Sequence, residues 1–469
     1  MWSLCLVLAL VQDPTPKLAA EAARADVALL RRVLDEVHPG TTRYVSAEEL
    51  ARAFAELDGR LDEGMTSGAL YLELSRLVGL VRCGHSRLEA PALEEYRAKN
   101  PTHLPFAFRL LEGRMLVTAA DASAGDLARG DEVLALDGTP VGELLAALAP
   151  LMPLDGRTDA ARASRLDTPY EWEDSGFDHY LPLVHGFQSE FELRLRGADG
   201  EVRTRKVPAV TLAANRKLRP AGARDFARGV STRDLDPETA LLTVETFVNY
   251  RNPVDPEAVY EPLFAGYLER GIAHLIVDLR SNGGGSDDAA WALGRFLARE
   301  PFTTAARPPR VKRIRFGDLV QHLETWQPGA FEAPPELFTQ LDDGWFEFKQ
   351  PPEAPLEPHP AAFPGRITVL TGPYNASGTT MLLAVLREHA ELRLVGEPTA
   401  GSAEGPTAGL IFFLKLPASG IRVNIPAYSQ RTSATRIEPG LGVTPDVLVP
   451  ETVADLLAGR DAALEKALE

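Results

Sequence analysis

The first eighty residues have the hydrophobic pattern of helices. From Leu18 to about Leu80, apolar residues recur at three- and four-residue spacing, with a break at Pro39-Gly40. Ser46 followed by Glu49 has the spacing of a capping box, which marks the start of a helix. The pattern predicts a small helical N-terminal region over residues 17–100, and this region includes His85 in the loop-like run Val81–Leu88.

From about Thr102 to Val210 the pattern changes to short alternating runs, which predict a β-rich module over residues 101–210. The expected strands are Pro105–Leu110, Met115–Thr118, Glu132–Leu136, Phe191–Leu195 and Val202–Val207. Between them, residues 124–141 contain a Gly-Asp turn, a strand and an Asp-Gly turn, and this passage resembles PDZ domains. No glycine-rich carboxylate-binding loop precedes Phe106, so the module is predicted to be a degenerate PDZ-like one.

After Thr239 strands alternate with helices, which predicts an α/β domain within residues 211–469. The expected elements are a strand at Ala240–Phe247, a helix at Glu257–Arg270, a strand at Ala273–Leu279, a helix at Asp287–Arg299, a strand at Ile367–Thr371 and a helix at Ser377–Glu388. Between them, Pro301–Pro364 is rich in proline and aromatic residues and predicts an inserted, partly irregular segment. The whole chain is thus expected to be an α/β (α+β) multidomain protein.

The length of the chain indicates its number of domains, and its net charge excludes some classes of partner. A chain of 469 residues is expected to form two or three domains. A net charge of −17 leaves no general basic surface, so nucleic acid and anionic membranes are poor candidate partners.

Residues 1–16 begin with a short apolar run that indicates a secretory signal, with a buried strand or a misplaced start codon as the alternatives. We therefore expect export to the periplasm or the extracellular space and no membrane span in the mature chain.

Two loops carry the candidate chemistry. Asp278-Leu-Arg-Ser-Asn-Gly-Gly-Gly-Ser286 follows one buried strand, and Thr371-Gly-Pro-Tyr-Asn-Ala-Ser-Gly-Thr379 follows another. Loops after neighbouring strands of an α/β sheet commonly meet at one site. Ser377 would provide a nucleophile and the glycine amides would bind an oxyanion. The plain alternatives are that Ser377 is a helix N-cap and that the glycines make a tight turn.

These loops, together with Gly396-Glu-Pro-Thr-Ala-Gly401 and Gly442-Val-Thr-Pro-Asp446, resemble the C-terminal processing (tail-specific) peptidases and tricorn core proteases. The order and spacing of the four blocks agree with that family over about two hundred residues. His38-Pro39 and the PDZ-like module also fit. The resemblance implies a ClpP/crotonase-like α/β catalytic domain and serine endopeptidase activity on peptide or protein substrates.

One departure from the family affects the mechanism. Bacterial processing peptidases have a catalytic lysine just after the Gly-Glu-x-Thr-x-Gly block, where this chain has Ser402. The tricorn-like branch uses a histidine and a glutamate instead. The resemblance places His85 as the general base and Glu438 as the acid that orients it, with Glu397 and Glu404 as alternatives to Glu438.

Further roles follow from the same resemblance. The oxyanion hole would be formed by the amide of Gly284, or of Gly283 as second choice, together with that of Gly378. The tricorn site has a further serine immediately before its histidine, where this chain has Gly84, so Ser86 or Ser402 is the substitute if a fourth member exists. Asp278, Arg280 and Asn282 are expected to fix the loop.

No cofactor and no metal are predicted. The nine histidines are scattered, and no His-Glu-x-x-His run or phosphate-binding glycine loop occurs. Outside the presumed signal, Cys83 is the only cysteine, so an internal disulfide in the mature chain is excluded. Two alternatives to a peptidase remain open: a non-catalytic protein that binds peptides or apolar ligands on the same fold, and an esterase for small acyl groups. The number of subunits is not predicted.

Overall fold

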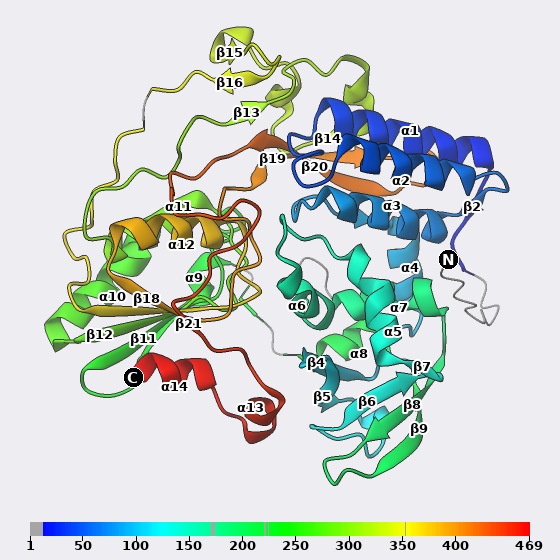
Figure 1. Cartoon of the computed structure of the whole chain (residues 1–469), viewed down its shortest axis with the longest axis horizontal. Coiled ribbons are helices and arrows are strands. Elements are labelled where there is room, and N and C mark those ends of the chain that lie inside the picture. The colour runs from blue at the N-terminus through cyan, green and yellow to red at the C-terminus, as the bar shows by residue number, and fades with distance from the viewer. Residues whose placement is uncertain (1–12, 170–173, 220–221, 224, 352) are drawn as a thin grey trace.

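The computed structural model describes residues 13–169, 174–219, 222–223, 225–351 and 353–469 (Figure 1). Most of the predicted signal segment, residues 1–12, lies outside this description. Within the described residues, no helix combines the length and the apolarity needed to cross a bilayer. The described chain forms a mixed α/β structure with several sheets, as the sequence pattern predicts.

The N-terminal region is helical, as predicted. Its elements are β1 Lys17–Leu18, α1 Ala20–Glu36, α2 Ala47–Gly59, β2 Met65–Thr66, α3 Ser67–Val81, β3 Leu88–Glu89 and α4 Pro91–Lys99. The capping box of Ser46 and Glu49 is confirmed at the start of α2, where both reciprocal hydrogen bonds are present. The loop between α3 and β3 carries His85.

The next region contains an antiparallel sheet in the order β4-β5-β6-β8-β9, with β7 beside β6. Its strands are β4 Phe106–Leu111, β5 Arg114–Ala120, β6 Glu132–Leu136, β7 Thr139–Pro140, β8 Glu190–Arg196 and β9 Val202–Pro208. All five predicted strands are present. Asp137 and Gly138 have φ values of 47° and 79°, as a type I′ turn between β6 and β7 requires.

Several helices of this region were not predicted. They are α5 Val141–Leu148, α6 Arg162–Asp167, α7 Gly176–His185 and α8 Leu212–Arg216. They are short, and the longest, α7, is buried over most of its length, so the two-faced pattern that reveals a surface helix is weak.

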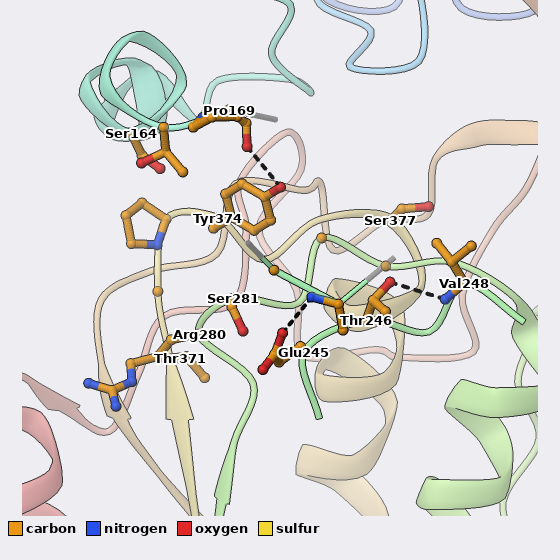
Figure 2. Close-up of a pocket in the computed structure, with 18 of the residues that line it drawn as sticks. Ser164, Pro169, Glu245, Thr246, Val248, Arg280, Ser281, Thr371, Tyr374 and Ser377 are labelled. Carbon is orange, nitrogen blue, oxygen red and sulfur yellow. Dashed lines mark hydrogen bonds between the residues drawn. The ribbon is translucent and has the colours of Figure 1, made fainter. Parts of the chain in front are cut away.

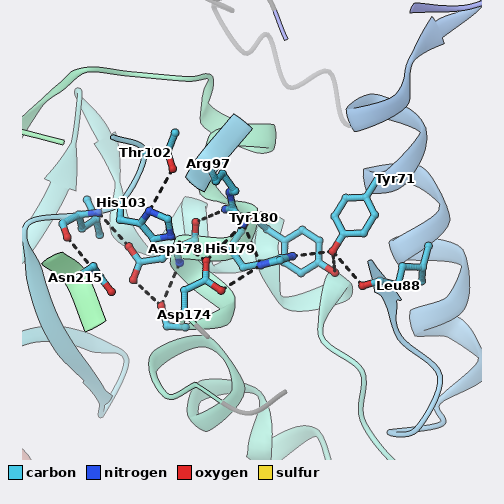
Figure 3. Close-up of polar contacts among 12 residues, drawn as sticks. Tyr71, Leu88, Arg97, Thr102, His103, Asp174, Asp178, His179, Tyr180 and Asn215 are labelled. Carbon is cyan, nitrogen blue, oxygen red and sulfur yellow. Dashed lines mark hydrogen bonds and ion pairs between the residues drawn. The ribbon is translucent and has the colours of Figure 1, made fainter. Parts of the chain in front are cut away.

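A buried polar network joins this region to the N-terminal helices (Figure 3). His179 of α7 lies between two helices: its Nε2 is 2.7 Å from the Tyr71 hydroxyl of α3, and its Nδ1 is 3.0 Å from the Arg97 guanidinium of α4. Asp174 pairs with both Arg97 and His103. Although burial raises the pKa of Asp174, the charges of His179 and Arg97 hold it well below its usual value. The network therefore fixes α7 against α3 and α4.

The C-terminal half is built on a six-stranded sheet in the order β10-β11-β12-β17-β18-β21, in which only β10 is antiparallel to its neighbour. Its strands are β10 Val230–Asp234, β11 Thr239–Val244, β12 His274–Asp278, β17 Arg366–Thr371, β18 Leu392–Gly396 and β21 Val447–Leu448. Helices α10 Pro256–Arg270, α11 Asp287–Leu297 and α12 Ser377–His389 share one core with this sheet, and α14 Ala462–Leu468 packs in a separate core. Helices α9 Phe226–Gly229 and α13 Val453–Ala458 are short connections.

A further sheet connects the two halves. It has the order β14-β19-β20-β13-β16-β15, and β3 also pairs with β20. Its strands are β13 Arg310–Val311, β14 Leu323–Glu324, β15 Phe338–Gln340, β16 Phe346–Phe348, β19 Thr407–Lys415 and β20 Arg422–Ser429. The predicted insert thus contributes only short strands and turns. Side chains of β19 and β20 share one core with α1–α3, so the N-terminal helices are held against the C-terminal half.

The packing of α10 gives a test of the α/β core. Phe264 is fully buried, with its ring stacked on Phe296 at 4.6 Å. Phe264→Ala is expected to lower the free energy of unfolding by about 3–5 kcal/mol because it leaves a cavity. Leu268→Ala, on the same helix but 42% exposed, should cost less than about 1 kcal/mol. Urea denaturation followed by tryptophan fluorescence measures both, and equal losses would contradict this assignment of the core.

Candidate active site

The two predicted loops meet at one edge of the parallel sheet. β12 and β17 are paired with Asp278 opposite Leu370, so the segments that follow them leave the sheet side by side. At Gly284, which has φ of 107°, an added Cβ would lie 2.8 Å from Ser377 Cβ and 3.0 Å from the Gly378 nitrogen. Only glycine allows this approach, and the glycine loop therefore lies directly against the start of α12.

Two buried asparagine side chains join the loops. Asn282 donates to the Val244 carbonyl (3.0 Å), and its Oδ1 accepts from the Thr379 hydroxyl of α12 (2.8 Å). Asn375 accepts from the Gly372 amide (2.8 Å) and donates to the Asn282 carbonyl (3.0 Å). Both side chains are fully buried, so breaking these bonds would leave buried polar groups unpaired. The expected role of Asn282 in fixing the loop is confirmed.

The charged pair at the end of β12 also fixes the loop. Arg280 binds Asp278, and it reaches Asp461 at the start of α14 with its Nη1 2.8 Å from Oδ1. The architectural role predicted for Asp278 and Arg280 is confirmed by these ion pairs.

Ser377 is not a helix N-cap. The N-cap position of α12 is Ala376, and Ser377 is the first residue of the helix, with φ of 50°. A left-handed conformation is unfavourable for a side chain with a Cβ, and such strain is typical of functional sites. The Ser377 Oγ lies 3.2 Å from His85 Nε2, within hydrogen-bond reach. The structure thus brings together two predicted site residues that are 292 positions apart.

The histidine comes from the N-terminal region, in the loop after α3. Its neighbour Ser86 is buried and its Oγ lies 2.9 Å from His38 Nε2, while His38 Nδ1 accepts from the Gly40 amide (3.0 Å). Ser86 is therefore engaged with His38. Ser402, the other candidate for a fourth member, accepts a hydrogen bond from the Tyr44 hydroxyl (3.2 Å).

A carboxylate that sequence reasoning did not single out lies beside His85. Asp155 is buried, and its Oδ1 accepts from the Gly84 amide (2.6 Å). Polar atoms of Cys83, His85 and Asp155 all lie within 4.8 Å of one another. Burial raises the pKa of Asp155, and the charge of His85 only partly offsets this rise. Asp155 lies in a segment without a motif, so nothing in the sequence marks it.

The thiol of Cys83 belongs to the same group. Its Sγ lies 2.8 Å from the Thr407 hydroxyl of β19. Burial raises the pKa of Cys83, but hydrogen bonds to His38 and His85 more than offset this, so the pKa lies well below its usual value. The surroundings of His85 therefore favour negative charge next to the imidazole.

The three glutamates named from sequence lie in different environments. Glu438 is exposed, and its backbone carbonyl accepts from the Leu441 amide (3.0 Å). Glu404 is buried in contact with Arg43 and the Tyr44 hydroxyl. Glu397 lines the cleft described below, where burial raises its pKa and the charge of Arg109 opposes that rise. The role predicted for Glu438 stays a prediction, and Asp155 is a second candidate for it.

The amides near Ser377 differ in their availability. The Gly284 amide donates to Asn282 Oδ1 (2.9 Å), so it is engaged within the loop. This observation disfavours Gly284, the first choice for an oxyanion donor, because a donor committed to a side chain is not free for substrate. Gly378 lies at the N-terminal end of α12, where amides point toward bound negative charge. Gly283 and Gly378 stay as the predicted donors.

A cleft of about 1810 Å³ opens in front of Ser377 and His85. Figure 2 shows Ser377, Thr246 and Val248 among the residues that line this cleft, and the Tyr374 hydroxyl donates to the Pro169 carbonyl at 3.2 Å. Apolar side chains that line the cleft are Met381, Ile411, Phe413 and Trp326, and charged ones are Arg109, Arg280 and Glu397. The cleft is larger than the usual pocket for a small ligand, which is about 300–1,000 Å³, and has room for an extended chain.

Comparisons with known proteins give the fold and the family of the matched region. Residues 238–449 match the model of Peptidase family S41. No curated protein sequence is significantly similar to the chain. Among solved structures, mature CPAF complexed with lactacystin superposes with a TM-score of 0.64 at 16% identity, covering 96% of this chain and 97% of that one. A CPAF mutant gives a TM-score of 0.65 at 16% identity, covering 93% and 94%.

A weaker similarity is to the photosystem II D1 C-terminal processing protease, with a TM-score of 0.41 at 15% identity, covering 92% of this chain and 93% of that one. The CPAF similarity extends over almost the whole of both chains, so the mixed α/β multidomain fold is shared beyond the matched region. The matched region, residues 238–449, includes both loops of the site, so this part of the chain is similar to peptidase family S41, a family of serine peptidases.

Proposed function

We propose that the protein is a serine endopeptidase whose nucleophile is Ser377 and whose general base is His85. The observation that carries this proposal is the 3.2 Å separation of Ser377 Oγ and His85 Nε2 in front of a large cleft. Ser377 also has the strained conformation that projects a nucleophile out of a strand–helix turn.

The proposed reaction follows from these positions. Ser377 Oγ attacks the peptide carbonyl while His85 Nε2 accepts its proton, and the amides of Gly283 and Gly378 bind the oxyanion. His85 then gives the proton to the leaving amine, and the C–N bond breaks. Water hydrolyses the acyl-enzyme by the same steps in reverse order, with His85 as base. A carboxylate near the imidazole stabilises the imidazolium, and burial beside His85 favours Asp155 for this role.

The remaining predictions belong to the same proposal. An extended peptide would occupy the cleft, and the PDZ-like module over residues 101–210 would form one side of its entrance, through Ala107, Phe108 and Arg109 of β4. Export to the periplasm or the extracellular space is proposed from the apolar start of the sequence.

The first prediction concerns the nucleophile and the base. Ser377→Ala and His85→Gln should each lower kcat by a factor of at least about 10³, because each removes a group that acts in the same proton transfer. Hydrolysis of an unstructured protein such as casein and labelling by a fluorophosphonate probe measure this. Ser402→Ala is the matched control and should retain labelling. An unaltered protein that never labels would favour the non-catalytic binding protein, and labelling with hydrolysis of small esters alone would favour the esterase.

The second prediction identifies the orienting acid. Asp155→Asn keeps the shape of the side chain but removes its charge, and we expect kcat to fall by about 10²–10⁴. Glu438→Gln, at an exposed position, should change kcat less than about threefold. Steady-state kinetics on both variants test this, with circular dichroism to establish folding. A larger loss of kcat in Glu438→Gln than in Asp155→Asn would assign the orienting role to Glu438.

The third prediction concerns pH. His85 must be neutral to accept a proton, and Asp155 must be ionised to stabilise the imidazolium, so kcat/KM should fall as pH decreases. Since burial raises the pKa of Asp155, its part of this loss begins at a higher pH than for an ordinary aspartate. Measuring kcat/KM between about pH 3 and 9 covers the ordinary pKa values of aspartate and histidine, about 3.9 and 6.5. A rate that stays constant toward acid pH would argue against His85 as the base.

A further inference from the structure

Three potential metal ligands lie together behind the proposed catalytic pair. Cys83 Sγ, a ring nitrogen of His85 and a carboxylate oxygen of Asp155 are all within 4.8 Å of one another. Cys83 and Asp155 are 5% and 7% exposed, so their positions are set by the fold. The group is formed by two segments: the loop after α3 gives Cys83 and His85, and the turn after α5 gives Asp155.

The space beside these ligands is large enough for one ion. Cys83 and Asp155 line a small cavity of about 10 Å³, together with Tyr44, Ser402 and Thr407. This volume is about that of a single water-sized sphere. His85 lines the large cleft, whereas Cys83 and Asp155 line the small cavity, so the three ligands lie between the two spaces.

The ligand types select the ion. A thiolate, an imidazole and a carboxylate are the three kinds of ligand that zinc binds in proteins, and three protein ligands with one open position are a common zinc arrangement. Tetrahedral bonds of about 2.0–2.3 Å require ligand atoms about 3.3–3.8 Å apart, so ligands within 4.8 Å need only small side-chain movements. The thiolate disfavours magnesium and calcium, which prefer oxygen ligands.

We propose that Cys83, His85 and Asp155 form an inhibitory zinc site, in which one bound ion reversibly blocks His85. His85 Nε2 faces Ser377, so the ion would bind the other ring nitrogen, Nδ1. When zinc occupies the lone pair of Nδ1, the ring hydrogen is on Nε2, and Nε2 has no lone pair to accept the proton of Ser377. On binding, the ion forms bonds to Cys83 Sγ, His85 Nδ1 and an Asp155 carboxylate oxygen, any proton on the Cys83 thiol is released to solvent, and the ring proton of His85 moves from Nδ1 to Nε2.

The inhibitory consequence rests on the proposed peptidase function, whereas zinc binding itself does not. The two are therefore measured separately, on the full chain in a buffer that does not chelate metals. Cobalt(II), which takes zinc sites, reports binding because a cobalt–thiolate bond gives a charge-transfer absorption band. Zinc added to the cobalt-loaded protein then gives the zinc affinity by competition.

We expect one cobalt ion per chain, with a thiolate band in the unaltered protein and in Ser377→Ala. Cys83→Ser should abolish the band and weaken zinc binding more than the 10–100-fold that loss of a supporting contact typically costs. Asp155→Asn should weaken binding and retain the band, which tests the site in a second variant. Cys5→Ser, at the other cysteine of the sequence, is the matched control and should bind as the unaltered protein does.

Activity gives the second measurement. Zinc at the concentration that fills the site should abolish peptide hydrolysis by the unaltered protein, and a chelator should restore it. For Cys83→Ser, inhibition relative to its own rate without metal should need more than about 100-fold more zinc.

Absence of the band, or equal zinc affinity in Cys83→Ser, overturns the site. Full occupancy without inhibition overturns its inhibitory role. A band in a protein that hydrolyses no peptide under any condition refutes the proposed function and leaves the zinc site standing.

Discussion

The contact between the glycine loop and the start of α12 is the constraint on which the site depends. Asn282 and Asn375 hold this contact with fully buried side-chain amides that reach both loops. Each lost hydrogen bond of this kind costs about 1–3 kcal/mol when a buried partner is left unpaired. These bonds offset the unfavourable left-handed conformation of Ser377 and keep its hydroxyl turned toward His85.

The position of His85, the proposed general base, depends on packing between distant parts of the chain. His85 follows α3, whose apolar side chains share a core with the hairpin β19–β20 of the C-terminal half. β3, directly after His85, pairs with β20, and Cys83 contacts Thr407 of β19. The histidine is therefore placed by a hydrophobic core and a strand pair, so changes in this core would alter the separation of His85 from Ser377 even though they touch neither residue.

The surroundings of His85 combine two requirements. A buried carboxylate next to an imidazole stabilises its charged form, which a general base needs during the reaction. The same closeness of thiol, imidazole and carboxylate creates the ligand set of a metal ion. In a site built this way, the groups that activate the base are the same groups through which a metal would inactivate it.

The local pattern of the sequence determined much of the fold. Apolar spacing located α1–α3, the five strands of the antiparallel sheet and the alternation from β11 to α12, because periods of 3.6 and 2 are set by each segment's own geometry. The motif around Ser377 and the glycine loop marked one side of the site, since both are contiguous in sequence. Helices α5–α8 were missed, because each has at most ten residues and so gives only a short stretch of helical pattern, and α7 is also buried over most of its length.

Only the tertiary structure decided which carboxylate stands beside His85. Asp155 lies in no motif, whereas the three glutamates lie close in sequence to the family blocks. Unlike Asp155, Glu438 is exposed, Glu404 contacts Arg43, and the pKa of Glu397 is affected by the charge of Arg109. The structure likewise showed that the Gly284 amide is already bonded to Asn282. Such facts depend on where separate segments come to rest against one another. His85 lies beside Asp155 and Ser377 because three separate regions pack together, and the order of apolar and polar positions within each region does not determine this contact.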